Sequence, residues 1–322
     1  MNNSSGDETS PDRMENKILY LLLRYDSIII VSHEYPDGDA FGSSAGFREA
    51  LSALFPEKRI YCLGPGQGQI VPYACQEAPD DLFPKSLVIV TDTANTARIY
   101  DKRWKLGKEV LKIDHHPLQD NYGDFSWVDA SFSSCSEMIV YLLQIWNAQI
   151  PHLAAELLFA GTVTDTGRFL FPGISSRTFE LTACLLEAGI DYQKIYRAVY
   201  DCEESTFRFK EHIFKDFQTE KQAGKIKFAY LKNNAALLDS YGLDPTRANL
   251  FVELLGDIKD VEVWAFFSED RGSGKIFAEL RSREKAVNAI AAKFGGGGHK
   301  NAAGIRLKSW EQVDEVIRVI AD

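Results

Sequence analysis

Apolar runs alternate with helically spaced apolar positions along the first part of the chain, and this alternation predicts strands connected by helices. Continuous apolar runs are typical of strands buried on both faces of a parallel sheet, and they occupy Ser27–Val31, Ser86–Val90 and Val110–Ile113. A further strand is predicted at Arg59–Leu63, followed by a loop at Gly64–Gly68. Helical spacing is found in Met14–Arg24, Ser134–Trp146, Leu153–Val163 and Ser176–Glu187, and in a segment that Asp39 would cap and that runs to about Leu54. The pattern predicts an α/β fold with a doubly wound parallel sheet.

The pattern changes in the last third of the chain, which predicts a second, smaller α/β domain. Strands are expected at Lys225–Lys232, Val261–Phe267, Lys275–Arg281 and Ile305–Leu307, and helices at Asn288–Phe294 and from Trp310 onward. The charged, weakly helical segment before them is interpreted as a connector. The predicted organisation is a disordered tail at 1–12, a first domain at 13–190, a helical connector at 191–223 and a second domain at 224–322.

Polar residues capable of chemistry stand where the first-domain strands end. Asp114-His115-His116 follows the strand Val110–Ile113, and ionisable residues are costly to bury there unless they are paired or bind a metal. A polar loop with chance histidines is the alternative, but three of the six histidines fall in two such loops. In doubly wound sheets the ligand binds beyond the carboxyl ends of the strands, so these side chains are expected to converge.

The candidate metal ligands are imidazoles and carboxylates: His33, Asp37, Asp39, Asp92, His116 and Asp165. Four carboxylates in one pocket would repel one another without cations, and two divalent ions would balance their charge. This ligand set suits Mn²⁺ best and would also accept Mg²⁺, Co²⁺ or Fe²⁺, whereas a structural zinc site would favour cysteine. Two ions can activate a water and clamp an in-line phosphoryl transfer. Taken singly, Asp92 and Asp165 could each be a helix cap.

Three further features could bind phosphate or a base. The run Gly295–Gly298 is either a flexible hinge or a loop whose backbone amides approach a ligand. Arg98 follows Asp92 by six residues and could hold a phosphate near the metals. Arg281 ends a predicted strand in the second domain, where it is either a ligand-binding or a surface arginine.

Composition limits the partners. The formal net charge of −10 argues against wrapping long nucleic acid, although a short anionic ligand remains open. No apolar run reaches membrane-spanning length, and the N-terminus has no signal-peptide pattern. Five scattered cysteines without a CxxC motif are typical of free thiols, so a reducing cytoplasm is predicted.

These motifs together resemble the DHH phosphoesterase superfamily, and within it the DHH–DHHA1 proteins of the nano-RNase A type. The resemblance covers almost the whole chain after the tail. It rests on the first-domain motifs at 32–40, 92–98, 114–117 and 164–169, and on the DHHA1-like motifs at 280–282 and 295–300. It implies a DHH domain, a smaller DHHA1 domain and an active site in the cleft between them.

The resemblance also implies roles at the matched positions. His33 and Asp37 would hold one Mn²⁺, and Asp39, His116 and Asp165 the other, with Asp92 bridging. Asp114 would orient its neighbours and His115 would face the scissile phosphate. The nucleotide would be held by Arg98, Arg281, Ser282, Gly296, Gly297, Gly298 and His299.

The implied activity is Mn²⁺-dependent hydrolysis of short oligoribonucleotides and linear dinucleotides to 5′-mononucleotides, together with conversion of 3′-phosphoadenosine 5′-phosphate to AMP. A cyclic dinucleotide phosphodiesterase is the main alternative. A pyrophosphatase is disfavoured by the glycine-rich tail, and a catalytically inactive nucleotide sensor by the complete ligand set. Substrate length, cleavage polarity and a homodimeric state are left open.

Overall fold

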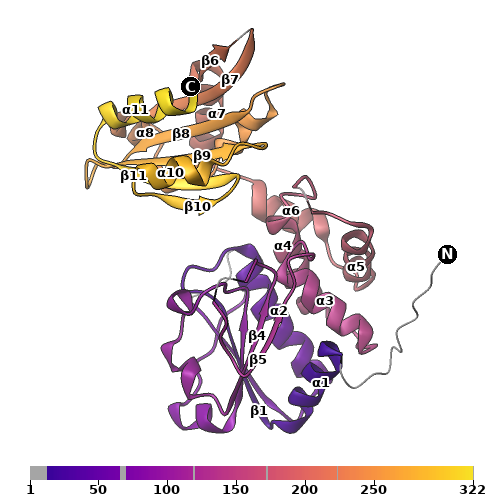
Figure 1. The fold of residues 1–322 in the computed structure, drawn as a ribbon. Coiled ribbons are helices and arrows are strands. Elements are labelled where there is room, and N and C mark those ends of the chain that lie inside the picture. Colours follow the sequence, from indigo (N-terminus) through magenta and orange to yellow (C-terminus); the bar gives the residue numbers. More distant parts are fainter. Residues whose placement is uncertain (1–12, 66–69, 119, 172, 223, 322) are drawn as a thin grey trace, which may run out of the picture. The chain divides into compact units, whose positions relative to one another are not determined.

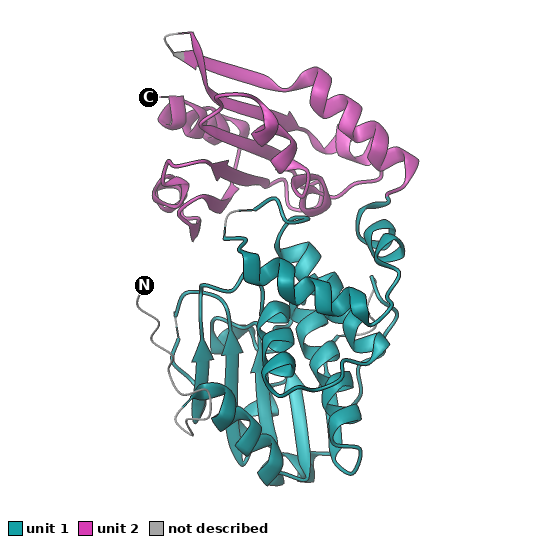
Figure 2. Cartoon of the chain, turned by 90° about the vertical axis from the view of Figure 1, so that its right-hand side faces the viewer, with its two compact units in different colours: residues 1–201 teal, residues 202–322 magenta. Residues whose placement is uncertain are grey.

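The computed structural model describes residues 13–65, 70–118, 120–171, 173–222 and 224–321. Its contacts divide the chain into two units, Met1–Asp201 and Cys202–Asp322 (Figure 2). The tail predicted at 1–12 and most of the loop predicted at Gly64–Gly68 lie outside the described residues. In the part of the chain that is described, none of the helices has both the length and the apolar character needed to cross a bilayer.

The first unit is built on a five-stranded sheet in which every pairing is parallel, as the sequence predicts. The strands are β1 (Ser27–Val31), β2 (Arg59–Leu63), β3 (Leu87–Thr91), β4 (Glu109–Asp114) and β5 (Phe125–Val128). Their order is β2-β1-β3-β4-β5, so chain progression reverses direction between β1 and β3. Figure 1 labels β1, β4 and β5 of this sheet. Such a reversal leaves a crevice outside the carboxyl ends of the two strands, where α/β proteins bind their ligands.

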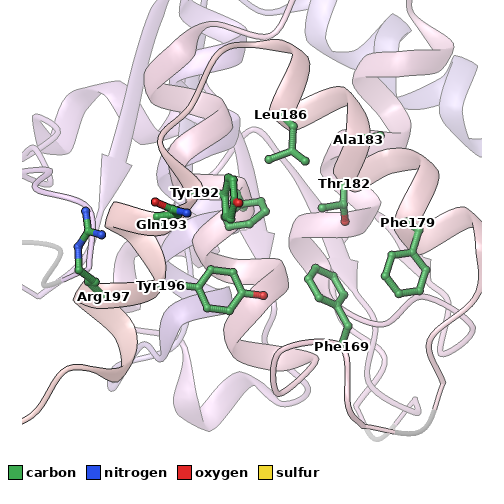
Figure 3. A pocket seen from close by; sticks show the side chains of 10 residues that line it. Phe169, Phe179, Thr182, Ala183, Leu186, Tyr192, Gln193, Tyr196 and Arg197 are labelled. Carbon is green, nitrogen blue, oxygen red and sulfur yellow. The ribbon is translucent and has the colours of Figure 1, made fainter.

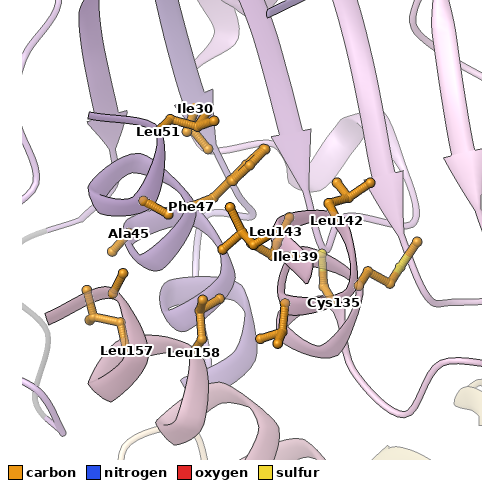
Figure 4. Packing of buried hydrophobic residues seen from close by; sticks show 14 of the residues in the cluster. Ile30, Ala45, Phe47, Leu51, Cys135, Ile139, Leu142, Leu143, Leu157 and Leu158 are labelled. Carbon is orange, nitrogen blue, oxygen red and sulfur yellow. The ribbon is translucent and has the colours of Figure 1, made fainter. Parts of the chain in front are cut away.

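Alternating strand residues fill two cores, one on each face of this sheet. Ile28 and Ile30 face α1 (Met14–Arg24), α2 (Gly38–Leu54), α3 (Cys135–Ile145) and α4 (His152–Asp165) (Figure 4). Ile29 and Val31 face the 3₁₀ helices η1 (Asp80–Lys85) and η3 (Lys102–Leu106). The unit is completed by α5 (Ser176–Glu187) and α6 (Tyr192–Tyr200). All ten strand residues of β1 and β3 are buried, which explains their continuous apolar runs.

Glycines bring α2 and α4 into close contact. A Cβ on Gly42 would lie 2.5 Å from the carbonyl oxygen of Leu157, and one on Gly161 would overlap the Ser136 hydroxyl. Small residues let helix backbones approach each other directly. This matters for the site, because α2 carries Asp39 near its start and α4 ends at Asp165.

The second unit is a six-stranded mixed sheet of order β10-β11-β9-β8-β7-β6, in which only β7 and β8 pair in parallel. The strands are β6 (Gln218–Gln222), β7 (Lys225–Asn233), β8 (Val263–Glu269), β9 (Ile276–Ser282), β10 (Gly297–His299) and β11 (Ala302–Leu307). One face packs on α10 (Val287–Lys293) and α11 (Trp310–Ala321). The other packs on α7 (Glu204–Asp216), α8 (Ala235–Ser240), α9 (Pro245–Asn249) and η4 (Val252–Asp257).

Several local predictions differ from the structure. The cap of α2 is Asp37, whose side chain accepts from the amides of Asp39 and Ala40, so the prediction of Asp39 as the cap is wrong. The segment interpreted as a connector contributes α6 to the first unit and α7 and β6 to the second. The glycine run predicted as a loop contains β10, an exposed edge strand paired with β11.

Candidate active site

The predicted ligands of the first unit converge at the carboxyl ends of β1, β3 and β4. His33 follows β1, Asp92 follows β3, and the histidine pair follows Asp114, the last residue of β4. Ligand atoms within 4.8 Å of one another form three groups among the described residues: His33, Asp37 and Asp92; Asp92, His115 and His116; and Asp39, His115 and Asp165. The pairings of β3 with β1 and with β4 bring these strand ends to one edge of the sheet.

Asp92 joins two of these groups. Its Oδ2 lies 3.9 Å from His33 Nε2, and its Oδ1 lies 3.5 Å from His115 Nε2 and 3.4 Å from His116 Nδ1. The backbone of Asp92 has a φ of 48°, in the left-handed region that non-glycine residues seldom adopt. Its amide donates to the carbonyl oxygen of Ile113 at 3.0 Å, which ties β3 to β4 at this point. An unusual backbone at a site where ligands meet is typical of a functional position.

Asp39 is fixed by the first turn of α3. Its carboxylate accepts from the amides of Cys135 at 2.6 Å and Ser136 at 2.9 Å, where the helix dipole favours a negative charge. Burial raises the pKa of Asp39 well above its ordinary value, and the charges of Asp92 and Asp165 raise it further. Burial likewise raises the pKa of Asp165 to about 6. Carboxylates crowded in this way need positive charge beside them.

The two histidines occupy different surroundings, and their grouping differs from the one expected. His115 Nε2 lies 3.3 Å from Asp165 Oδ2 and 3.9 Å from Asp39 Oδ2, so His115 and not His116 is grouped with these two carboxylates, and the metal role expected for His116 stays a prediction. Burial alone would lower the pKa of His115, but the surrounding carboxylates, Asp92 first, raise it to about 10. His116 Nδ1 instead lies 2.8 Å from Asp114 Oδ1, and one third of its side chain is exposed.

The residues fit divalent cations. Asp92 Oδ1 and His115 Nε2 are buried and have no hydrogen-bond partner in the described structure. Both residues belong to the groups of candidate ligands described above. Buried polar atoms are normally satisfied, and two cations bound among these overlapping groups would satisfy them. The donors are carboxylate oxygens and imidazole nitrogens without a thiolate, which suits Mn²⁺, Mg²⁺, Co²⁺ or Fe²⁺.

Asp114 and Arg98 lie at the border of this cluster. Asp114 is fully buried, and although burial alone would raise its pKa, hydrogen bonds from His116 and the charge of Lys112 lower it. Arg98 is exposed, and its Nη2 lies 3.5 Å from His33 Nδ1. The carbonyl of Arg98 accepts from the amide of Glu34 at 2.7 Å, so the segment after β3 is held against the segment after β1.

The residues predicted to bind substrate in the second unit separate into two sets. Arg281, Gly296 and Gly297 line a cavity of about 640 Å³ beside β9 and β11. The side chain of Arg281 is paired with Glu253 at 2.7 Å and with Glu279. Ser282, Gly298 and His299 do not line this cavity. Neighbouring residues of a strand face opposite sides, and the hydroxyl of Ser282 donates to the carbonyl of Lys285 and accepts from Asn301.

A second large cavity lies away from the ligand cluster. It has a volume of about 680 Å³ and is lined by aromatic side chains of the first unit, among them Phe169, Phe179, Tyr192 and Tyr196 (Figure 3). Arg197 is the charged residue in its lining, and none of the predicted ligands reaches it. The arrangement that can do chemistry is therefore the cluster at the strand ends.

Sequence reasoning missed one buried charged group beside the cluster. Lys112 lies in the middle of β4 with no exposed surface, and its Nζ is 3.3 Å from Asp114 Oδ2. The signal was a single lysine inside an otherwise apolar run, which was interpreted only as part of a buried strand.

Comparisons with known proteins show the family of this chain. The family model described as "DHH family, N-terminal domain" matches residues 27–162, and the one described as "DHHA1 domain" matches residues 225–322. The bifunctional oligoribonuclease and PAP phosphatase NrnA of Bacillus subtilis is 35% identical over 314 residues, which cover 96% of this chain and 97% of the relative. The probable NrnA of Streptococcus mutans is 33% identical over 300 residues, covering 93% and 95%.

Among solved structures, an exopolyphosphatase-related protein from Bacteroides fragilis matches with a TM-score of 0.83 and 26% identity, covering 95% of each chain. The two family models thus match the two units in order, and the two NrnA relatives are matched over nearly their full length. The chain belongs to the DHH phosphoesterases, with a DHH domain followed by a DHHA1 domain, and is a hydrolase of that family.

Proposed function

We propose that this protein hydrolyses short oligoribonucleotides and linear dinucleotides to 5′-mononucleotides, and 3′-phosphoadenosine 5′-phosphate to AMP, with two divalent cations, preferably Mn²⁺. The observation that carries the proposal is that two groups of ligand atoms share Asp92, whose buried Oδ1 makes no hydrogen bond among the described residues. The substrate class follows the names of the relatives from Bacillus subtilis and Streptococcus mutans, which are 35% and 33% identical.

The geometry of the cluster suggests how the cations are shared. His33, Asp37 and Asp92 would hold one, and Asp39, His115 and Asp165 would hold the other together with Asp92. When bound, two such ions neutralise the carboxylates, lower the pKa of a water molecule and bind the oxygens of a transferring phosphoryl group. This proposal gives His115 the ligand role first assigned to His116.

His116 is then free to act on the substrate. Its Nδ1 donates to Asp114 Oδ1, which fixes the ring and leaves Nε2 for a phosphate oxygen. Burial alone would lower the pKa of His116, but the bond to Asp114 and the charge of Asp92 raise it, so a positive charge can be held near the reacting phosphate. The exposed guanidinium of Arg98 would contribute a second positive charge.

The second unit would bind the nucleoside part of the substrate. Its cavity of about 640 Å³ offers Arg281 and the glycine-rich edge strand β10, whose outward amides have no neighbouring strand. In the first unit, a cavity of about 330 Å³ beside Asp37 has apolar walls that include Phe41 and Val71, which suit a sugar or a base.

The test is a product time course with Mn²⁺ on 5′-labelled RNAs of about two to twenty-four nucleotides, run beside 3′-phosphoadenosine 5′-phosphate and cyclic dinucleotides. We expect the fastest turnover on RNAs of about two to five nucleotides and release of AMP from the bisphosphate. Preferential turnover of the cyclic dinucleotides would favour the alternative phosphodiesterase. Absence of turnover on every substrate would overturn the proposal.

A further inference from the structure

Lys112 is a charged residue buried at the centre of the first unit. It has no exposed surface, and its neighbours in β4, Leu111 and Ile113, are fully buried apolar residues. Lysine is seldom buried completely unless its charge is paired, because removing an ammonium group from water is costly. The catalytic cluster described above does not include it.

The ammonium group of Lys112 has three oxygen atoms close to it. Its Nζ donates to the carbonyl oxygens of Asp120 at 3.1 Å and Ala94 at 3.3 Å, and it lies 3.3 Å from Asp114 Oδ2. Asp114 Oδ2 has no hydrogen-bond partner among the described residues, so the ion pair with Lys112 is what holds this oxygen. The ring of Tyr122 covers the remaining side, with its centroid 4.5 Å from Nζ.

The partners of Lys112 belong to two loops that carry the site. Ala94 lies in the loop after β3, which begins at Asp92, whereas Asp120 lies in the loop after the histidine pair. The same two loops are joined a second time by Tyr122, whose hydroxyl donates to the carbonyl of Thr93 at 2.6 Å. They are joined a third time by the carboxylate of Asp120, which accepts from the amide and hydroxyl of Thr96.

We propose that Lys112 is a positioning residue for phosphoester hydrolysis, which holds the Asp114 carboxylate against His116 and ties the loop of Asp92 to β4. Its charge faces one oxygen of Asp114 while the other oxygen receives His116 Nδ1. The residue does not touch the reacting atoms and acts through Asp114. This inference uses the role proposed above for His116.

A purely structural lysine would behave differently. A methionine side chain fills nearly the same space, and removing one partner of a buried ion pair costs stability whether or not the pair also serves catalysis. If Lys112 only filled space, Lys112→Met would change the melting temperature and leave turnover alone. If it positions Asp114, the carboxylate loses its partner and His116 loses its fixed orientation.

The test compares Lys112→Met, Asp114→Asn and the double variant in the full-length protein, with Lys108→Met as a control at an exposed lysine just before the same strand. The substrates are a two-nucleotide RNA and bis-p-nitrophenyl phosphate, and kcat and KM are measured below the melting temperature. The ¹⁵N resonance of His116 Nδ1 is recorded in the metal-free protein, and the affinity for Mn²⁺ is measured by calorimetry.

We expect Lys112→Met to lower kcat on both substrates by about 10- to 100-fold with little change in KM, the range seen for residues that orient a catalytic group. The His116 Nδ1 resonance should shift, and the double variant should lose no more activity than the worse single variant. Wild-type kcat in Lys112→Met, or losses that multiply in the double variant, would overturn the proposal.

Lys112→Gln keeps the test decisive if the methionine variant does not fold. Glutamine still donates to a carbonyl but has no charge to place beside Asp114, so the same loss of kcat and the same resonance shift are expected. If neither variant folds, the lysine is needed for the fold itself, and the positioning role fails. Because the resonance shift and bis-p-nitrophenyl phosphate do not depend on the RNA substrate, a wrong substrate class would be recognised separately.

Discussion

At the scale of single residues, Asp92 is the position on which the site depends. Its left-handed backbone places one carboxylate between His33 and the two adjacent histidines. Asparagine tolerates that backbone better than most residues and has nearly the same shape. Asp92→Asn should therefore keep the fold and remove the shared charge.

We expect Asp92→Asn to lower turnover of a two-nucleotide RNA by more than about 10²-fold, since even residues that only orient a ligand cost up to that much. The melting temperature of the metal-free protein should not fall. Asp81→Ala, which removes an exposed acid, serves as the control. Near-normal turnover by Asp92→Asn with Mn²⁺ would contradict the two-metal proposal.

The charge of His115 gives a prediction about pH. In the metal-free protein its pKa is raised to about 10, above its ordinary value, so the proton stabilises the metal-free fold fully below about pH 6.5 and this contribution is lost as the pH rises through about 10. A metal-binding imidazole must be neutral. Mn²⁺ binding near pH 8 should therefore release about one proton, and the affinity should rise with pH.

The number of protons released is measured by calorimetry in buffers with different ionisation enthalpies. The variant His115→Asn should lose the proton release and bind one metal ion fewer. The variant His116→Asn should keep the proton release and both metal ions but lose turnover. The opposite result, with one metal lost in His116→Asn and two retained in His115→Asn, would restore the roles first expected from the sequence.

The ligands predicted from the sequence lie close together in the first unit, and which of the two histidines holds a metal stays a prediction. The predicted ligands of the first unit follow strand ends, and parallel strands bring their carboxyl ends to one edge. The roles of two adjacent residues depend on where the strand stops. β4 ends at Asp114, and the two histidines follow it in a segment without regular alternation, so the apolar pattern of the strand does not say which of them faces the carboxylates.

At the scale of elements, the contact between α2 and α4 sets the distance between ligands on different helices. Gly42→Ala would place a methyl group against the carbonyl of Leu157, and backbone cannot yield as a flexible side chain does. We expect a loss of about 1–3 kcal/mol in the free energy of unfolding, together with weaker Mn²⁺ binding because Asp39 would move away from Asp165.

Chemical denaturation and calorimetry test this prediction. Gly272→Ala is the control, because its methyl group would come no closer than 3.6 Å to any heavy atom. If Gly42→Ala is destabilised but binds Mn²⁺ with unchanged affinity, the contact between α2 and α4 does not set the distance between the ligands, and the prediction is refuted.

Long, strongly patterned elements were predicted well, and short ones were not. The helix Met14–Arg24 and the strands Ser27–Val31 and Arg59–Leu63 have the predicted limits. The strand β10 was missed because glycine disfavours strands and its three residues carry no apolar alternation. Its pairing with β11 is a tertiary effect that a local pattern does not contain.

At the scale of the whole molecule, each unit has a separate task in the proposed function. Arg281→Ala should raise KM for a two-nucleotide RNA by about 10-fold or more, the value of one charge-assisted hydrogen bond, and leave Mn²⁺ content unchanged. Hydrolysis of bis-p-nitrophenyl phosphate, which offers no nucleoside, should change much less.

Arg271→Ala is the matched control, because Arg271 is an exposed arginine of the same unit that pairs with Asp239. Equal losses on both substrates would place Arg281 in the fold or in the catalytic centre. The glutamates beside Arg281 make the measurement informative, since a ligand phosphate must compete with Glu253 and Glu279 for the same guanidinium.

The net charge of −10 predicts how turnover depends on substrate length. Each additional phosphate of a long RNA meets little positive charge, so RNAs of about two to five nucleotides should be preferred over about twenty-four. Binding of the short substrates should weaken only slightly with salt, with a slope of about −1 to −2 for two or three contacted phosphates. A preference for long RNA with a steep slope would indicate a basic channel.

The exposed edge strand β10 also affects how the protein behaves at high concentration. An open sheet edge can recruit strands from other molecules and start aggregation. β10 is only three residues long, and Gly297 and Gly298 give it little tendency to extend such pairing. The strand would thus leave its outward amides open to the proposed ligand while presenting a poor template to another chain. Bulkier residues in this strand would strengthen it and make self-association easier.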